Sequence, residues 1–326
     1  RTAPGRSLRN GLSRSRDGGR VLVAGPGVAG HLLQGAWIVL WDSVLVAAGL
    51  ILLFAGGEGL VRGSVAIAGR LRISRMIVGM VIVGFGTSTP ELLVSLQAAL
   101  AGSPEISIGN VVGSNIANVL LIIGLSALVY PILNSDTSIR REACVMLAVS
   151  AALVALLLTG SVSRLAGGVM LALLAGYLFV TYRIESRRRE SAFTNEADEV
   201  AGIHMAPAMA AGAALAGLVM LMLGARFLVD GATGIARGFG VSEALIGLTI
   251  VAVGTSLPEL ATSLIAAWRK HADVALANII GSNIFNILAI LGITALVTPV
   301  PVASRFAWLD GPLMLVTALT LTVLLF

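Results

Sequence analysis

Long apolar stretches separated by short polar connections run along most of the chain. A helix needs about 20 predominantly apolar residues to cross the hydrocarbon core of a bilayer, and these stretches reach that length. The predicted spans are residues 36–60, 76–101, 105–130, 141–160, 163–182, 206–229, 244–268, 272–298 and 307–326. The pattern therefore predicts an all-α integral membrane protein in contact with the lipid bilayer.

Composition supports a membrane protein and removes one class of partner. Hydrophobic residues make up 57% of the chain, charged residues make up 12%, and the mean hydropathy is +0.95. An isoelectric point near 10.3 would suggest a nucleic-acid partner for a soluble protein. Here the basic residues lie in short connections between spans, where they set membrane orientation. We expect no nucleic-acid partner.

The chain repeats itself at a constant offset of 168 residues. Gly-Thr-Ser-Thr-Pro-Glu at 86–91 returns as Gly-Thr-Ser-Leu-Pro-Glu at 254–259, and Gly-Ser-Asn-Ile at 113–116 returns at 281–284. The register holds without a gap from about 49 to 127 and from 217 to 295. Such self-similarity indicates duplication of one ancestral unit.

The repeat divides the chain into predicted parts. The first repeat covers 36–183 with five spans, and the second covers 205–326 with four. Because five is odd, two such units in series enter the membrane from opposite sides, which predicts two inverted five-helix repeats (5+5). The tenth helix is then missing from this chain. A polar linker, 184–204, joins the repeats.

Basic residues predict how the protein lies in the membrane. If the connection after the first span is cytoplasmic, twelve Lys and Arg of the connections lie on that side and four lie opposite. This excess predicts a multi-pass protein of the inner (plasma) membrane with a cytoplasmic linker. The Arg-rich tail, 1–35, disagrees, since it would lie outside. It begins without Met and has no counterpart in the repeat, so we expect a non-native segment, with a secretory signal as the alternative.

The six-residue motif places oxygen atoms inside an apolar helix. Pro90 and Pro258 each lack an amide hydrogen and clash with the carbonyl four residues earlier, which frees that oxygen. Hydroxyl groups precede each proline, and Glu91 or Glu259 follows it. Carbonyls, hydroxyls and a carboxylate are hard ligands of the kind that Ca²⁺ and Na⁺ prefer.

The second motif adds amide and hydroxyl groups. Ser114 and Asn118 are four residues apart and share a helix face, as do Ser282 and Asn286. Gly-Ser-Asn runs often serve helix packing alone, but paired intramembrane carboxylates favour an ion site. Two carboxylates balance one divalent cation, two Na⁺ or two protons, so exchange through one shared site is reasonable.

The other intramembrane polar residues are interpreted as structural. Two pairs with four-residue spacing occupy corresponding places in the repeats and can neutralise themselves: Glu58 with Arg62, and Arg226 with Asp230. Glu142 and Asp310 also correspond, without an assigned role. Cys144 lies alone in an apolar run, which predicts a small buried side chain and neither a disulfide nor a thiolate metal site.

On these motifs, residues 40–326 resemble the calcium/cation antiporter superfamily, in particular its prokaryotic sodium/calcium exchanger-like members. The resemblance implies ten helices in two inverted halves and ions bound at mid-membrane between the second, third, seventh and eighth helices. It implies that the ligands are the backbone oxygens of Gly84 and Ala252 and the side chains of Thr87, Ser88, Glu91, Ser114, Asn118, Thr255, Ser256, Glu259, Ser282 and Asn286. Some family members carry Asp where this chain has Asn286, which leaves coupling to K⁺ or H⁺ open.

Three functions compete. The leading hypothesis is a secondary active antiporter that exchanges Ca²⁺ for Na⁺ by alternating access and uses no cofactor. The alternative is a Ca²⁺/H⁺ antiporter, in which protonation of Glu91 and Glu259 releases Ca²⁺. A third reading, from another class, is a truncated cation-binding membrane protein that does not transport. An intramembrane hydrolase fits poorly because no His lies near the repeated serines, so we expect no enzyme.

Overall fold

The computed structural model describes residues 26–71, 77–131, 137–192, 205–242, 246, 250 and 252–326. Most of them are helical, as the apolar pattern predicts. The predicted tail falls outside this part up to residue 25, and the predicted linker does so over 193–204.

The first half of the described chain is helical apart from one very short strand. Its elements are α1 (Pro26–Leu71), η1 (Val78–Gly84), α3 (Phe85–Thr87), α4 (Thr89–Leu100), α5 (Pro104–Ala117), η2 (Asn118–Ile123), α6 (Gly124–Val129), α7 (Thr137–Leu157), β1 (Ser161–Val162) and α8 (Arg164–Ala192). The elements α5, η2 and α6 follow one another without a break, as one long helix. The η elements are π-helical turns.

The second half follows a similar order of helices. Its elements are α9 (Pro207–Gly238), α11 (Ala252–Gly254), α12 (Leu257–Trp268), α13 (Ala272–Phe285), η4 (Asn286–Leu291), α14 (Gly292–Val297), β2 (Val300–Pro301), η5 (Phe306–Asp310) and α15 (Gly311–Leu324). Here α13, η4 and α14 form the long unbroken helix.

Six helices of the described chain are long and apolar enough to cross a membrane, and one bent pair makes a seventh. The bent pair is Val78–Thr87 with Thr89–Leu100, at an angle of 42°. Two predicted spans do not meet these criteria. α7 carries three charges at 140–142 near its start, and the second-repeat counterpart of the bent pair is described only in part, ending in the 12-residue α12.

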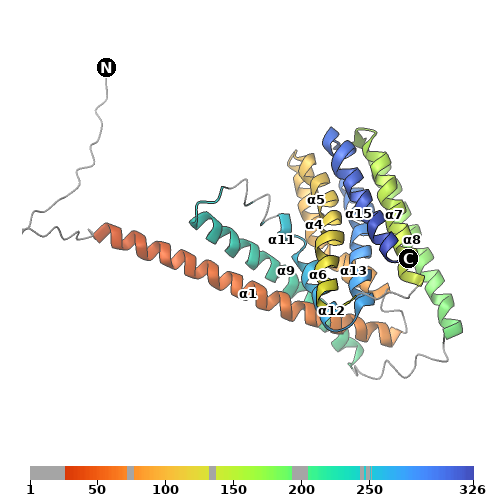
Figure 1. Cartoon of the computed structure of the whole chain (residues 1–326), viewed down its shortest axis with the longest axis horizontal. Helices are drawn as coiled ribbons and strands as arrows, with labels where there is room; N and C mark the ends of the chain where they lie inside the picture. Colours follow the sequence, from red (N-terminus) through yellow and green to blue (C-terminus); the bar gives the residue numbers. More distant parts are fainter. Residues whose placement is uncertain are drawn as a thin grey trace, which may run out of the picture.

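The long helices α1 and α9 lie side by side and slant away from the upright bundle formed by the other helices (Figure 1). Glycines at seven-residue spacing line their interface: Gly49, Gly56 and Gly63 on α1, and Gly217, Gly224 and Gly231 on α9. A Cβ on Gly217 would stand 2.4 Å from the backbone nitrogen of Leu60. The two helices therefore touch backbone to backbone, as small residues allow in membranes.

We expect Gly217→Ala to destabilise the protein, although alanine favours helix. The new methyl group would overlap backbone atoms of α1, and overpacking costs about 1–3 kcal/mol, more than the roughly 0.8–1 kcal/mol gained in helix propensity. Gly212→Ala on the same helix is the matched control, since its Cβ would meet no described atom within 4 Å. Thermal unfolding of the purified variants in detergent tests this. Equal midpoints for both variants would contradict the close packing.

The largest apolar core surrounds α13. It includes Ile280 and Ile284 of α13, Met146 of α7 and Leu321 of α15, all buried. In the span Ala272–Val297, 89% of the most apolar window is buried, far more than in the other described spans. This helix is therefore the centre of the bundle, enclosed by protein.

A short antiparallel ribbon connects the two halves at one end of the bundle. β1 pairs with β2 in the register Ser161 with Pro301 and Val162 with Val300. Gly160 precedes β1 at φ +82°, a conformation that glycine adopts without strain. The ribbon ties the turn between α7 and α8 to the connection after α14.

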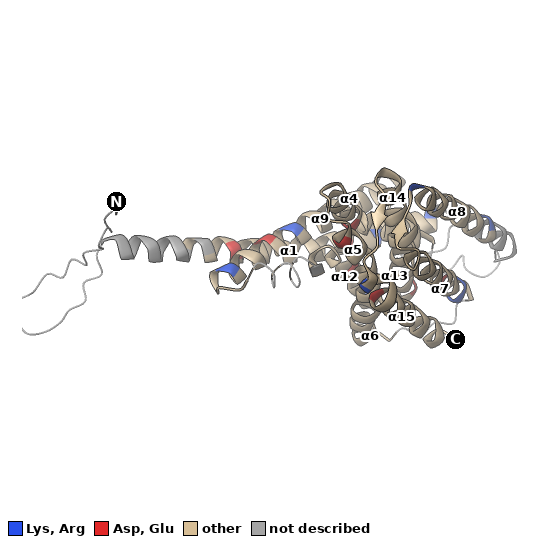
Figure 2. Cartoon of the chain, turned by 90° about the horizontal axis from the view of Figure 1, so that it is seen from above, with Lys and Arg blue, Asp and Glu red and all other residues tan. Residues whose placement is uncertain are grey.

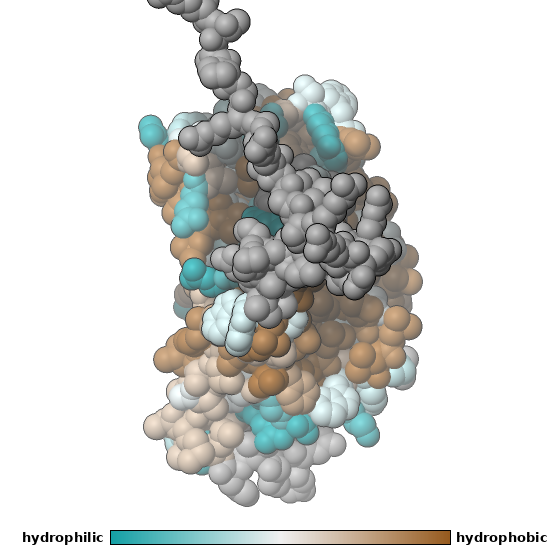
Figure 3. Space-filling model, turned by 90° about the vertical axis from the view of Figure 1, so that its left-hand side faces the viewer, coloured by the Kyte–Doolittle hydropathy of each residue, from teal (hydrophilic) through white to brown (hydrophobic). Residues whose placement is uncertain are grey.

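The outer surface is largely apolar, as expected for contact with lipid. Figure 3 shows brown, hydrophobic patches on both flanks of one face. Cys144 belongs to this outer surface, because its side chain is exposed. The predicted burial of Cys144 is therefore wrong: an apolar run does not distinguish a core position from a lipid-facing one.

Basic residues of α7 and α8 lie toward helix ends (Figure 2). Both predicted four-residue pairs form, Arg62 with Glu58 and Arg226 with Asp230. Glu58 also accepts a hydrogen bond of 3.0 Å from Nε of Arg269, at the end of α12. The first pair thus also anchors α1 to the second half of the chain.

Candidate ion site

Each repeated Gly-Thr-Ser motif breaks a helix at its serine. Ser88 lies between α3 and α4 with φ −81° and ψ 6°, and Ser256 precedes α12 with φ −86° and ψ 5°. These values fall in the sparsely populated bridge region, where many functional residues lie. The breaks come two residues before Pro90 and Pro258, because proline is tolerated in the first turn of a helix.

The two breaks face each other, and their side chains bond across the halves. The hydroxyl of Ser88 donates to Oε1 of Glu259 at 2.9 Å, and the hydroxyl of Ser256 donates to Oε1 of Glu91 at 3.3 Å. Both glutamates are only 1% exposed. The structure thus brings together four of the predicted site residues in one reciprocal arrangement.

The second oxygen of each glutamate, Oε2, has no hydrogen-bond partner among the described residues. None of the ion pairs formed within the described ranges includes Glu91 or Glu259 either. A buried carboxylate without a counter-charge costs several kcal/mol, so such groups occur mainly where a cation or proton neutralises them.

The predicted amides, Asn118 and Asn286, are buried and bond across the two halves. Asn118 donates through Nδ2 to Oδ1 of Asn283, and Asn286 donates to Oδ1 of Asn115, each at 2.9 Å. Within the part of the chain that the structure describes, the side-chain oxygens Oδ1 of Asn118 and Asn286 accept no hydrogen bond. Both residues begin a π-helical turn, η2 and η4, and such turns are frequent at functional sites.

The remaining predicted ligands differ in whether their oxygens already have hydrogen-bond partners. Thr87 donates to the carbonyls of Val83 and Gly84, whereas the Thr255 hydroxyl has no partner among the described atoms. The Gly84 carbonyl also accepts from the amide of Ser88 at 3.1 Å and the hydroxyl of Ser282 at 3.4 Å. It is therefore well satisfied by protein donors.

Two further predicted positions complete the set. Ala252 begins α11, and Ser114 lines the cavity described below. Two other asparagines bond the backbone carbonyls of the two glutamates. Asn110 donates to the carbonyl of Glu91 at 3.0 Å, and Asn278 donates to that of Glu259 at 3.5 Å. Sequence reasoning missed this pair, although the 168-residue offset relates Asn110 to Asn278.

A cavity of about 590 Å³ leads from the surface toward these groups. Its lining includes the predicted ligands Ser114, Thr255 and Ser256, together with Arg305 and Asp310, an ion pair of 2.9 Å. Side chains between them are mostly apolar. The cavity gives one side of the bundle access to the candidate site.

The corresponding place in the other half is closed. A small cavity of about 10 Å³ borders Ser88, beside Phe85 and Phe285, whose ring centroids are 5.0 Å apart. Their repeat counterparts, Val253 and Ala117, line the open cavity. The structure is therefore open on one side of the candidate site and closed by an aromatic pair on the other.

A glycine brings the two halves into close contact on the closed side. A Cβ on Gly281 would stand 2.6 Å from the carbonyl oxygen of Met80, so η1 packs directly on α13. A Cβ on the corresponding Gly113 would meet no described atom within 4 Å, and the counterpart of Met80, residue 248, lies outside the described residues.

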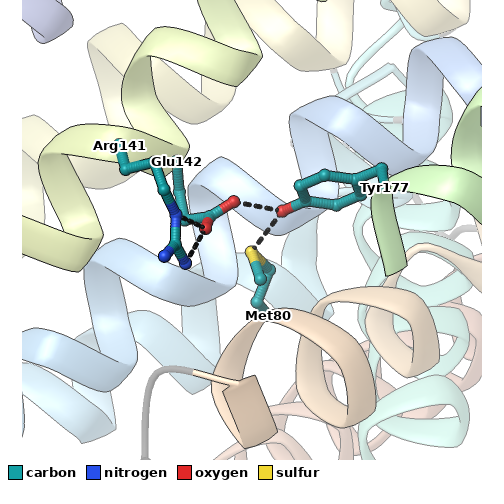
Figure 4. Close-up of polar contacts among 4 residues, drawn as sticks. All are labelled: Met80, Arg141, Glu142 and Tyr177. Atoms are coloured by element: carbon teal, nitrogen blue, oxygen red, sulfur yellow. Dashed lines mark hydrogen bonds and ion pairs between the residues drawn. The ribbon is translucent and has the colours of Figure 1, made fainter. Parts of the chain in front are cut away.

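A polar cluster lies behind the closed side (Figure 4). Tyr177 of α8 donates to Oε2 of Glu142 on α7 at 2.6 Å, and its hydroxyl lies 2.8 Å from the sulfur of Met80. Arg141 donates through Nε to Oε1 of the same glutamate at 2.8 Å. Glu142, unassigned from sequence, thus helps to hold η1. Its counterpart Asp310 lines the open cavity.

The slanted helix α9 covers both helix breaks. A Cβ on Gly86 would lie 3.1 and 3.3 Å from the two methyl carbons of Leu218. A Cβ on Gly254 would lie 2.3 Å from a methyl carbon of Val229. One helix is therefore in contact with the flexible glycine of each motif.

Comparison with known proteins places the chain among relatives of the same architecture. The model of the family "Sodium/calcium exchanger protein" matches residues 41–183 and 209–326. Sodium/calcium exchanger MaX1 of Methanosarcina acetivorans is 31% identical over 315 residues, covering 86% of this chain and 90% of that protein. Inner membrane protein YrbG of Escherichia coli is 36% identical over 265 residues, covering 80% of this chain and 81% of that protein.

Solved structures of the sodium-calcium exchanger NCX_Mj have the same fold. For the crystal soaked with 10 mM Na⁺ and 10 mM Sr²⁺, the TM-score is 0.76 and the identity is 33%. The match covers 88% of this chain and 91% of that one.

Proposed function

The chain belongs to the sodium/calcium exchanger protein family and is a membrane cation antiporter rather than an enzyme, and on this premise we propose that it exchanges Ca²⁺ for Na⁺. The exchange uses the site between α4, α5, α12 and α13. One observation carries the proposal: among the buried side-chain oxygens that lack a hydrogen-bond partner in the described residues, five belong to predicted ligands, namely Glu91, Asn118, Thr255, Glu259 and Asn286. The two glutamates lie where serines bridge the two halves.

This set of oxygens suits a cation in number and charge. Ca²⁺ takes six to eight oxygen ligands, with further ones supplied by hydroxyls, carbonyls or water. The two carboxylates balance one Ca²⁺ or two Na⁺, so either occupant neutralises the buried charge. Competition for the same oxygens then couples the two ions.

Alternating access follows from the unequal sides of the site. In the described state, the cavity past Arg305 and Asp310 admits ions, and the Phe85–Phe285 pair excludes them opposite. We propose that the halves, built as inverted repeats, exchange these roles. With the orientation expected from the basic connections, the cavity faces outward and the segment between the repeats is cytoplasmic. The match to an inner membrane protein supports a plasma-membrane location.

Proteoliposomes test the coupling ion. The purified chain is reconstituted in vesicles loaded with Na⁺, in vesicles loaded with K⁺, and in K⁺-loaded vesicles with an imposed pH gradient, and radiolabelled Ca²⁺ uptake is measured. We expect uptake only with internal Na⁺. Uptake driven by the pH gradient alone would replace the proposal by Ca²⁺/H⁺ exchange. Ca²⁺ binding without uptake in any vesicle would indicate a binding protein that does not transport.

A further inference from the structure

Four asparagines form one hydrogen-bonded group where α5 meets α13. They are Asn115 and Asn118 of the first half and Asn283 and Asn286 of the second, each no more than 2% exposed. Two of them, Asn118 and Asn286, belong to the proposed ion site. The other two have no role in binding by the arguments above.

The surroundings of Asn115 and Asn283 determine how their side-chain amides are oriented. Nδ2 of Asn115 donates to the backbone carbonyl of Asn283 at 3.4 Å and to the sulfur of Met314 at 3.6 Å. Nδ2 of Asn283 donates to the backbone carbonyl of Asn115 at 3.4 Å and to the sulfur of Met146 at 3.5 Å. Carbonyl oxygens and thioethers only accept hydrogen bonds, so the group that faces them must be the NH₂.

This orientation fixes the ligand amides in turn. Because their Nδ2 groups donate to backbone carbonyls and sulfur atoms, Asn115 and Asn283 can offer only Oδ1 to the opposite ligand amide. Asn286 and Asn118 must therefore turn their NH₂ groups toward these oxygens, at 2.9 Å each. Their own carbonyl oxygens then point the other way and are without a partner in the described part of the structure.

We propose that Asn115 and Asn283 are positioning residues, each of which holds the opposite ligand amide so that its oxygen, and not its nitrogen, faces the cation. The inference rests on the proposed ion site. An amide turned by 180° would present an NH₂ group, which repels a cation. The two residues are thus specificity determinants that contact another side chain rather than the ion.

The arrangement also selects Asn over Asp at the ligand positions. A carboxylate at 118 would place one of its oxygens against Oδ1 of Asn283, where two acceptors meet without a hydrogen. The same holds at 286 against Asn115. This chain therefore keeps a site with two carboxylates and two oriented amides.

The test is a double-mutant cycle on Asn283 and Asn118, read by Ca²⁺ titration calorimetry on the purified full chain. Asn283→Leu leaves the Asn118 amide free to turn, and we expect the dissociation constant for Ca²⁺ to rise about tenfold, as for loss of one buried hydrogen bond. Asn283→Ala is measured in parallel, because the smaller side chain fits without a clash. Thr294→Val is the matched control: its buried hydroxyl bonds only within the same long helix, at 2.7 Å to Ile290.

Rescue separates positioning from packing. In Asn283→Leu combined with Asn118→Asp, the carboxylate presents an oxygen to the ion in either orientation, so we expect affinity within about threefold of the parent protein. Asn118→Asp alone should weaken binding, giving strong non-additivity. If Asn283→Leu and Asn283→Ala bind normally while Glu91→Gln does not, the positioning role is overturned and the ion site stands. If Glu91→Gln also binds normally, the proposed site itself is overturned.

Discussion

We expect replacement of Glu259 or Glu91 by Gln to abolish Ca²⁺ uptake into Na⁺-loaded proteoliposomes and to leave the yield of folded protein nearly unchanged. The substitution removes a carboxylate whose free oxygen is buried and has no partner among the described residues. Losing one member of a buried charge pair costs roughly 3–5 kcal/mol, which corresponds to a loss of at least about a hundredfold in affinity. The uncharged amide is easier to bury without an ion, so folding does not suffer.

The matched control is Glu105→Gln. Glu105 lies in the first turn of α5, and its side chain is exposed. It is the same chemical change outside the proposed site and should leave uptake within about twofold. Near-normal uptake by both Glu91→Gln and Glu259→Gln would rule out the proposed pair of carboxylates, whatever the fold.

Gly281→Ala is expected to impair exchange by a different route. Its methyl group would stand 2.6 Å from the carbonyl oxygen and 2.8 Å from Cα of Met80, and backbone atoms cannot turn aside. We expect η1 to be displaced from α13, the closed side to open, and Na⁺-driven Ca²⁺ uptake to fall at least about tenfold, for an overpacking cost near 1–3 kcal/mol.

Gly113→Ala is its repeat-equivalent partner. Gly113 lines the open cavity and its methyl group would meet no described atom within 4 Å, so we expect folding and Ca²⁺ binding to be kept. Exchange should slow, since the site would be biased toward the described state. Accessibility of single cysteines to a membrane-impermeant thiol reagent measures this bias, with Leu121→Cys in the open cavity and Ala289→Cys on the closed side. The exposed Cys144 is first replaced by Ala. Unchanged labelling of Ala289→Cys in the Gly281→Ala protein would contradict the proposed closure.

Much of the fold and part of the candidate site could be predicted from the sequence, because both depend on strong local signals. Apolar length predicts the helices, and the doubled motifs predict that Ser88, Glu91, Ser256 and Glu259 meet. The position of the helix breaks was less certain from sequence. Proline marks the region, but the chain turns at the serine two residues earlier, where backbone geometry and not composition decides.

Other features depend on tertiary contacts that no single stretch encodes. Asn115 looks like a packing residue until Asn283 and Met314 are placed beside it. Glu142 and Asp310 are equivalent in sequence, yet one is buried beneath Tyr177 and the other lines a cavity. Two halves that carry the same motifs also cannot reveal which side is open, since both states use the same residues. The glycine spacing on α1 and α9 was visible in the sequence and would have predicted their close contact.

The position of α9 over both helix breaks has a consequence for leakage. An exchanger dissipates its gradient whenever both sides of the site open together. Here Leu218 and Val229 of the same helix, α9, contact Gly86 and Gly254 of the two motifs, and α1 packs backbone to backbone along α9. A displacement of α9 that removes the contact at one glycine therefore also moves the side chain in contact with the other. On the proposed exchange mechanism, we therefore expect α9 to couple the two openings so that they do not occur together, which would keep the downhill ion from passing without its counterpart.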